Sequence, residues 1–265
     1  MPLTSAAICP HPPGLIPAVA GPAAAEWDRS RTACLESVRR LNIPQLGVDA
    51  NGRAVPATHD EPTPDLLVVV GGDETTRTFD SSGAYASLRQ AGIDWQFGWE
   101  GSGEPQPLPL TLSLGYWLLI TGTPPGMILI DIVFQAISYD ATPEECLALG
   151  KDLAGRTDNV AMLVLGEGSA VRGVTTRPHP DSAAATFDAK IAQALAEADT
   201  TTLGQLTPRE SRGFNATGRA AWQVLAGAAG EQRFHATLLE SACQGLGHFV
   251  ASWRQAPVGD RGSGA

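Results

Sequence analysis

The stretch Ile8-Cys9-Pro10-His11-Pro12-Pro13 decides how the first part of this chain is interpreted. An apolar run, Ala6 to Ile8, leads directly into it, which is typical of a buried strand that ends abruptly. Proline fixes φ and favours extended geometry in the residue before it, so His11 is held stiffly between prolines. Open α/β sheets bind ligands at the carboxyl ends of their strands. His11 is therefore a candidate metal ligand or acid–base group, and the alternative is a turn histidine that only bonds the backbone.

Outward from this stretch, strand-like and helix-like patterns alternate. Continuous apolar runs indicate buried strands at 3–9, 65–70, 126–133 and 159–165. Apolar periodicity predicts helices at 23–41, 112–120, 143–153, 183–198 and 215–229. We expect one α/β domain over residues 1–258, with a central mostly parallel or mixed sheet flanked by helices, and a flexible tail at 259–265. The turns after Cys9, Val70 and Leu165 should meet at one edge of the sheet, and that edge is the expected site.

Composition limits the classes of partner. The 265 residues carry a formal net charge of −10, and no basic cluster is longer than Arg39-Arg40, so we expect neither nucleic acid nor an anionic membrane as a partner. The apolar stretch 108–120 is shorter than the ~20 residues that cross a bilayer. Four cysteines lie far apart without a CxxC pair, which argues against a zinc ribbon and predicts reduced thiols. The first residues show no basic signal-peptide region, so we expect a soluble cytoplasmic protein.

Three further segments carry polar side chains that could reach the same edge. Asp73 and Glu74, which follow Gly71-Gly72, could bind a divalent cation or act as a base, or they could be solvated loop carboxylates. Glu167 and Ser169 lie in Gly166-Glu167-Gly168-Ser169, which is either a backbone anion nest or a tight turn. His248 lies late in the chain, in 245–249. No HxH, HxxxH or HExxH spacing places two histidines on one helix.

Taken in order, these segments resemble the class III extradiol ring-cleavage dioxygenases, catalytic-subunit type, including their Memo-like relatives. The stretch 9–13 is similar to the opening of that family, 64–73 to its second strand and loop, and 163–169 to its strand that ends in a Gly-x-x-Ser turn. Shorter matches continue to residue 254. The resemblance implies a single domain of that fold, a homo-oligomer, and a mononuclear Fe(II) held by two histidines and one glutamate, with a further acid–base histidine.

The resemblance also implies that the iron site is incomplete here. His11 matches the first metal ligand, but Glu74 stands where the second ligand histidine is expected, and Ala170 where the acid–base histidine is expected. The ligand glutamate has no counterpart near the start of the Trp222 helix, where the chain has Asn215, Thr217, Gly218 and Arg219. We therefore expect a partial metal site at His11 and Glu74. The expected ligand-binding residues are Asp73, Glu167, Ser169 and His248.

Alternative functions follow from this pattern. The first is a diverged, catalytically inactive dioxygenase-like protein that binds a small molecule, a metal or a partner protein, with Fe(II), another divalent metal or no cofactor. The second is an active metal-dependent dioxygenase that opens a catechol-like ring with O₂, with His179, His235 or His248 supplying a ligand. The third is a subunit that acts by association with other copies.

Overall fold

The computed structural model describes residues 3–44, 46–48, 54–56, 63–98, 104–123, 130–170, 180–243 and 246–257. Within them the strands are β1 (Leu3–Cys9), β2 (Leu46–Val48), β3 (Ala54–Pro56), β4 (Leu66–Asp73), β5 (Arg77–Phe79), β6 (Ala84–Ser87), β7 (Gln96–Phe97), β8 (Gln106–Pro107), β9 (Asp131–Ser138), β10 (Val160–Leu165), β11 (Phe234–Cys243) and β12 (Leu246–Gln255). The α-helices are α1 (Pro17–Ala20), α2 (Asp28–Arg39), α3 (Leu110–Gly122), α4 (Pro143–Ala154), α5 (Pro180–Glu197), α6 (Thr200–Gly204), α7 (Pro208–Gly213) and α8 (Arg219–Ala229). Short 3-10 helices are η1 (Pro13–Leu15), η2 (Gly21–Trp27) and η3 (Arg89–Ala91).

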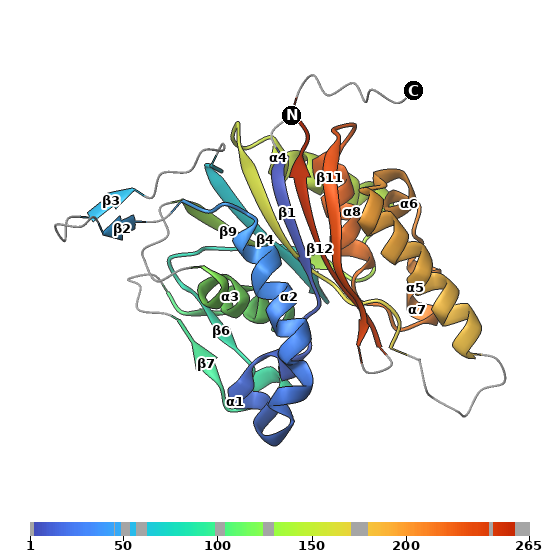
Figure 1. Ribbon diagram of the computed structural model, residues 1–265, viewed down its shortest axis with the longest axis horizontal. Helices are drawn as coiled ribbons and strands as arrows, with labels where there is room; N and C mark the ends of the chain where they lie inside the picture. Colours follow the sequence, from blue (N-terminus) through green and yellow to red (C-terminus); the bar gives the residue numbers. More distant parts are fainter. Residues whose placement is uncertain are drawn as a thin grey trace.

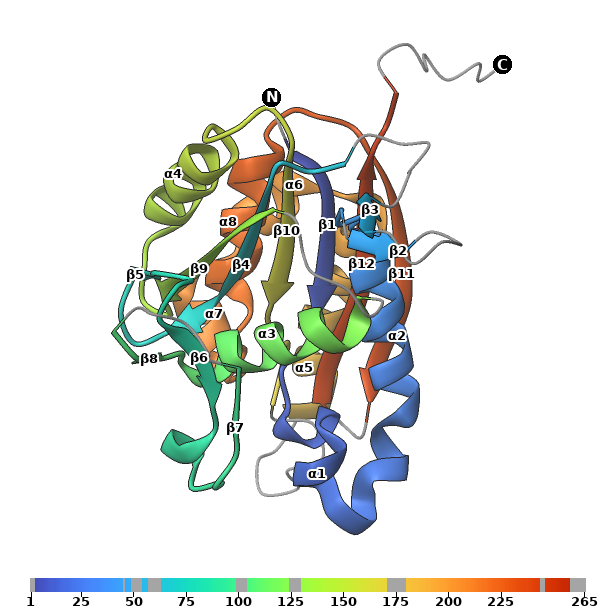
Figure 2. The same cartoon turned by 90° about the vertical axis from the view of Figure 1, so that its left-hand side faces the viewer.

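A seven-stranded mixed sheet in the order β11-β12-β1-β10-β4-β9-β5 forms the centre of the molecule (Figure 1). Helices α2 and α3 cover one face, and α4, α5, α6 and α8 cover the other (Figure 1 and Figure 2). Each face has its own buried apolar cluster. Trp222 and Trp253 are fully buried in the cluster beneath α4, α5, α6 and α8. The predicted α/β class, with a mixed sheet flanked by helices, is confirmed. None of the described helices is both long enough and apolar enough to span a membrane.

The strands β1, β10 and β4 run parallel, side by side, and their carboxyl ends coincide. Cys9 lies opposite Leu165, and Leu165 lies opposite Gly71. Almost every side chain of these strands is buried, because helices cover both faces; this is why they read as continuous apolar runs. The predicted meeting of the three turns at one edge is therefore correct.

The antiparallel strand β12 brings the C-terminal part of the chain to that same edge. On β12 and β1, Ser5 lies opposite Arg254, and Ile8 lies opposite Ala251. Continuing this register by three residues on each strand leads to His11 and His248. The two histidines are thus brought to corresponding positions by strand pairing, although they lie 237 positions apart in the sequence.

Some predicted elements differ from the structure. The strand predicted at 126–133 is β9, which runs from Asp131 to Ser138; residues 124–129 lie outside the described part, as does the tail at 259–265. Gln135 interrupts the apolar pattern of β9, yet its side chain is buried because it accepts a bond from Thr78 Oγ1 at 2.6 Å and donates to the Ala136 carbonyl at 2.8 Å. A buried polar residue that is hydrogen-bonded within the sheet interrupts the apolar run by which a strand is recognised.

Two helices begin later than predicted, and one predicted loop is a strand. The helix predicted from residue 23 begins at Asp28, after the 3-10 turn η2. The helix predicted from residue 215 begins at Arg219, because Asn215 has φ +52°. The segment Gly71 to Asp73 belongs to β4 and pairs with β9, so only Glu74 of the predicted acidic loop lies beyond the strand.

Candidate functional site

His11, Glu167 and His248 meet at the carboxyl edge of β1 and β10. The backbone N–H of His11 donates to Glu167 Oε1 at 3.3 Å, and His248 Nε2 lies 3.9 Å from the same oxygen. Both histidines are buried, whereas 23% of the Glu167 side chain is exposed. We call these three residues the His–Glu cluster. The carboxylate of Glu167 forms the side of this cluster that faces solvent.

The turn after β10 carries Glu167 to this place. The Gly166 N–H donates to the Cys9 carbonyl at 3.0 Å, which extends the parallel ladder one residue beyond β10. The carbonyl of Glu167 accepts from the Gly218 N–H at 2.9 Å at the start of α8. A Cβ at position 166 would lie 2.6 Å from the Gly218 Cα, so this close approach of turn and helix requires glycine.

Ser169 fastens the same turn to β12 and α5. Its N–H donates to Asp188 Oδ1 at 2.8 Å, and its hydroxyl donates to Asp188 Oδ2 at 2.6 Å. Backbone bonds join Gly168 to Gly247 (2.6 Å) and Gly247 to Ser169 (2.8 Å), so the residue before His248 is held directly. Ser169, predicted as a ligand-binding residue, is in contact with a buried carboxylate and positions His248. Asp188 was not predicted as a site residue, because the Ala-rich pattern of its helix gives no sign of it.

Tyr139 adds a phenol next to the carboxylates of this edge. It follows β9, and its N–H donates to the Asp73 carbonyl at 2.9 Å. Its ring covers Gly72, where a Cβ would lie 2.3 Å from the ring. Burial first, and then the negative charges of Asp73, Glu74 and Glu167, raise the pKa of Tyr139 to about 12. The phenol is therefore a hydrogen-bond donor at neutral pH. Tyr139 is not among the predicted site residues, because the strand before it was expected to end at residue 133.

The imidazole of His248 is neutral at pH 7. Burial lowers its pKa; the charge of His11 acts in the same direction, and Glu167 and Asp188 oppose it. Among the described residues, neither ring nitrogen of His248 nor Nδ1 of His11 has a hydrogen-bond partner. Two more buried atoms near the start of α8, Thr217 Oγ1 and Trp222 Nε1, also have no hydrogen-bond partner among the described residues. Buried polar atoms are normally satisfied, so this group favours a water or ligand that bonds to them.

The described residues do not fit the three-ligand iron site that the resemblance implies. No three His, Cys, Asp or Glu side chains within the described ranges are placed to share a metal ion. Glu74, predicted to join His11, is exposed, and its carbonyl accepts from Ser138 Oγ at 3.1 Å. Position 170 is alanine, and the Arg219 guanidinium bonds the carbonyls of Tyr139 and Ala141.

Of the alternative ligands that the structure describes, His235 is not brought to this edge, whereas His248 is. His235 is exposed on β11 and lines a cavity with Thr4 and Ser5, at the opposite end of β1. His179 lies outside the described residues. Of the late histidines in the described part, His248 alone joins His11.

The pH dependence of stability tests the environment of His248. Because its native pKa is below the ordinary value of about 6.5, the unfolded chain binds the proton more readily than the folded chain. The contribution to stability is complete above about pH 6.5 and is lost as the pH falls below it. His248→Asn should therefore flatten the decline in the free energy of unfolding between pH 7 and 5, by about 1.4 kcal/mol for each tenfold difference in proton affinity between the folded and unfolded chains.

Urea denaturation at pH 5, 6, 7 and 8 measures this slope. His235→Asn, which changes an exposed histidine, is the matched control and should keep the slope of the unmodified protein. Equal slopes for His248→Asn and the unmodified protein would contradict the assignment.

No protein-family model matches the chain, and no curated protein matches it. Among solved structures, the chain is similar to the uncharacterized protein JW3007 from Escherichia coli K12, at 13% sequence identity and a TM-score of 0.48. That similarity covers 94% of this chain and 99% of the other.

Proposed function

We propose that this protein is a diverged extradiol dioxygenase-like protein that binds a small molecule at the His–Glu cluster and does not cleave it. The observation that carries the proposal is the set of unpaired buried imidazole nitrogens next to the Glu167 carboxylate, among the residues that the structure describes. A bound molecule that exchanges hydrogen bonds with these atoms offsets the cost of burying them. The position at the carboxyl edge of parallel strands agrees with where α/β sheets bind ligands.

The chemistry of the cluster favours a neutral, hydroxylated aromatic ligand. Glu167 accepts hydrogen bonds, and neutral His248 offers one donor and one acceptor. The negative charges at Asp73, Glu74 and Glu167 disfavour an anionic ligand. The Trp27 ring lies 5.8 Å from the His248 ring, centroid to centroid, and provides an aromatic wall. A catechol combines a flat apolar ring with two hydroxyl donors and matches these groups.

Calorimetric titration with catechol tests the proposal. We expect saturable binding, and we expect Glu167→Gln to weaken it about 10-fold, which corresponds to ~1.4 kcal/mol. Glu74→Gln, which neutralises an exposed acid near the same edge, is the control and should leave the dissociation constant unchanged within about 2-fold. No saturable binding, or equal losses in both variants, would refute the proposal.

A retained dioxygenase is the second candidate. The His–Glu cluster has the donor types of a facial Fe(II) site, two imidazoles and one carboxylate, although the described side chains are not placed to share an ion. Anaerobic reconstitution with Fe(II), followed by iron analysis, tests it against His11→Ala. Iron that is bound by the unmodified protein and lost in the variant, together with a ring-cleavage chromophore from catechol and O₂, would establish this candidate and overturn the first. Catechol binding without iron uptake or product supports the first.

A further inference from the structure

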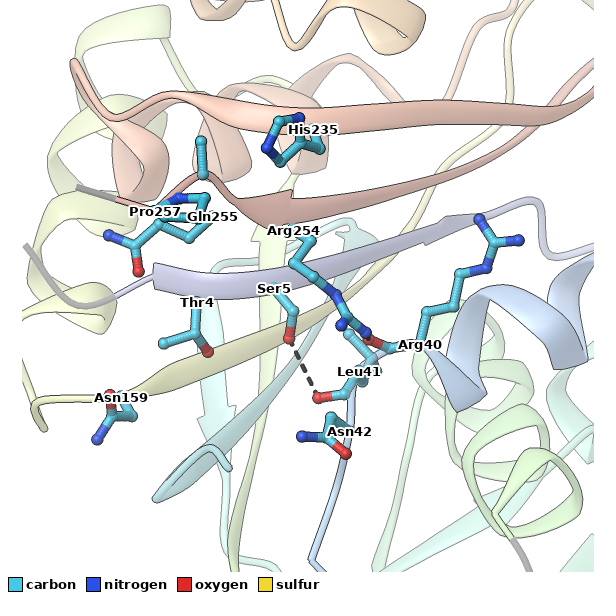
Figure 3. Close-up of a pocket in the computed structure, with 11 residues that line it drawn as sticks. Thr4, Ser5, Arg40, Leu41, Asn42, Asn159, His235, Arg254, Gln255 and Pro257 are labelled. Carbon is cyan, nitrogen blue, oxygen red and sulfur yellow. Dashed lines mark hydrogen bonds between the residues drawn. The ribbon is translucent and has the colours of Figure 1, made fainter. Parts of the chain in front are cut away.

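A second polar cavity lies at the opposite end of the parallel strands from the His–Glu cluster. It has a volume of about 500 Å³, which is within the range of small-molecule sites. Its walls come from the start of β1, the end of α2, the start of β10, the start of β11 and the end of β12 (Figure 3). We call it the amino-edge pocket. Because five separate segments form it, no local sequence motif indicates it.

The side chains that line the amino-edge pocket are basic or neutral. Arg40, Arg254 and His235 contribute to its wall, together with the amides of Asn42 and Gln255, and none of the described residues that line it is an aspartate or glutamate. The whole chain has 28 acidic residues against 18 lysines and arginines, so a cavity lined in this way contrasts with the rest of the protein. A low-dielectric cavity lined by one sign of charge attracts the opposite charge.

Arg254 is the central cation of the pocket. In Figure 3 its side chain extends from β12 toward Leu41 and Asn42. Its Nη2 donates to the Arg40 carbonyl at 3.4 Å. Arg40 is paired through Nε with Glu36 Oε1 at 3.1 Å, so its charge is partly neutralised.

The end of α2 would repel an anion if its carbonyls were bare, because they form the negative end of the helix dipole. The first two carbonyls after α2 are already bonded: that of Leu41 accepts from Ser5 Oγ at 3.2 Å, and that of Arg40 accepts from Arg254. Asn42 follows with φ +57°, a left-handed conformation that ends the helix and turns the chain along the pocket. These two pocket-lining residues therefore do not present bare carbonyls to an anion.

We propose that the amino-edge pocket binds a small organic anion whose carboxylate or phosphate is held by Arg254. The guanidinium presents paired N–H donors that match two oxygens of either group. The amides of Asn42 and Gln255 bond the remaining oxygens. The apolar side chains Leu41, Ala256 and Pro257 contact the organic part of the ligand. The site is separate from the His–Glu cluster and carries the opposite charge preference.

Calorimetric titrations with phenyl phosphate, benzoate and uncharged benzyl alcohol test this inference on the full chain. We expect saturable binding of one or both anions, weakened by added salt, and no measurable binding of benzyl alcohol. The anion that binds more tightly shows whether the pocket prefers a phosphate or a carboxylate. Arg254→Gln should weaken that binding about 10-fold or more, whereas Arg89→Gln, which changes an exposed arginine on η3, should leave it unchanged.

Two further variants keep the test decisive. Asn42→Gly preserves the left-handed backbone and removes the amide, so it should weaken binding about 3-fold or more even if Arg254→Gln folds poorly. Glu167→Gln should leave anion binding unchanged, because it lies at the other edge. Absence of saturable anion binding up to about 10 mM, a concentration well above the micromolar-to-millimolar affinities of small-molecule sites, or equal binding by the unmodified protein, Arg254→Gln and Asn42→Gly, would overturn the inference.

Discussion

Replacing Gly150 by alanine is expected to lower the free energy of unfolding by about 3 kcal/mol or more. Gly150 lies in α4 where this helix packs on α8. A Cβ there would lie 1.9 Å from the Val224 carbonyl oxygen and 2.7 Å from the Ala228 nitrogen. These are backbone atoms of the facing helix, so they cannot rotate aside as a side chain would. The two helices must separate, which opens the apolar core that they share with the sheet.

The facing side of this contact depends on glycine in the same way. A Cβ at Gly227 of α8 would lie 2.1 Å from the Leu147 carbonyl oxygen of α4. Urea denaturation measures the effect, with Gly213→Ala as the control, because a Cβ at that position meets nothing within 4 Å. The control should stay within about 0.5 kcal/mol of the unmodified protein. Equal stability of Gly150→Ala and Gly213→Ala would mean that the helices do not pack this closely.

Burial on both faces explains which strands are predictable from the sequence. Nearly all side chains of β1, β4 and β10 are buried in the core. Their continuous apolar runs therefore predict the positions of these strands to within a few residues. The predicted position of β9 is wrong because its buried Gln135 interrupts the apolar run. The side chain of Gln135 accepts a hydrogen bond from Thr78, a residue of another strand. Local patterns carry no information about a partner that is distant in sequence.

The same distinction applies to the site. His11 and Glu167 are predictable because each follows directly from a recognisable strand, and the parallel pairing then brings them together. For His248 the sequence indicates only that the side chain could reach the carboxyl edge of the sheet. Its position depends on the antiparallel register of β12 with β1, which the sequence does not show. Asp188 and Tyr139 contact the site through tertiary structure, and their local sequence patterns resemble ordinary helix and strand ends.

Replacing Arg219 by methionine is the second change with a large expected effect, about 3 kcal/mol of lost stability. The guanidinium is 1% exposed and donates to the Ala141 carbonyl at 2.5 Å, to the Tyr139 carbonyl and to Gln223 Oε1 at 3.0 Å. Methionine has similar length but no donor, so both carbonyls lose this bond. Each buried polar group left unpaired costs about 1–3 kcal/mol, and the apolar packing of methionine recovers only part of that sum.

The position of Arg219 gives this prediction a consequence for the site as well. It is one of the four residues found in the region where the resemblance to the dioxygenases implies a ligand glutamate, and it ties α8 to the segment that carries Tyr139. Arg212→Met is the control, since Arg212 is 64% exposed and pairs with Asp140 of the same segment; we expect a loss of at most about 1 kcal/mol. Urea denaturation compares the two variants, and catechol titration reports the site. If Arg219→Met matched Arg212→Met in both measurements, the buried guanidinium would not be what holds Tyr139 beside the His–Glu cluster.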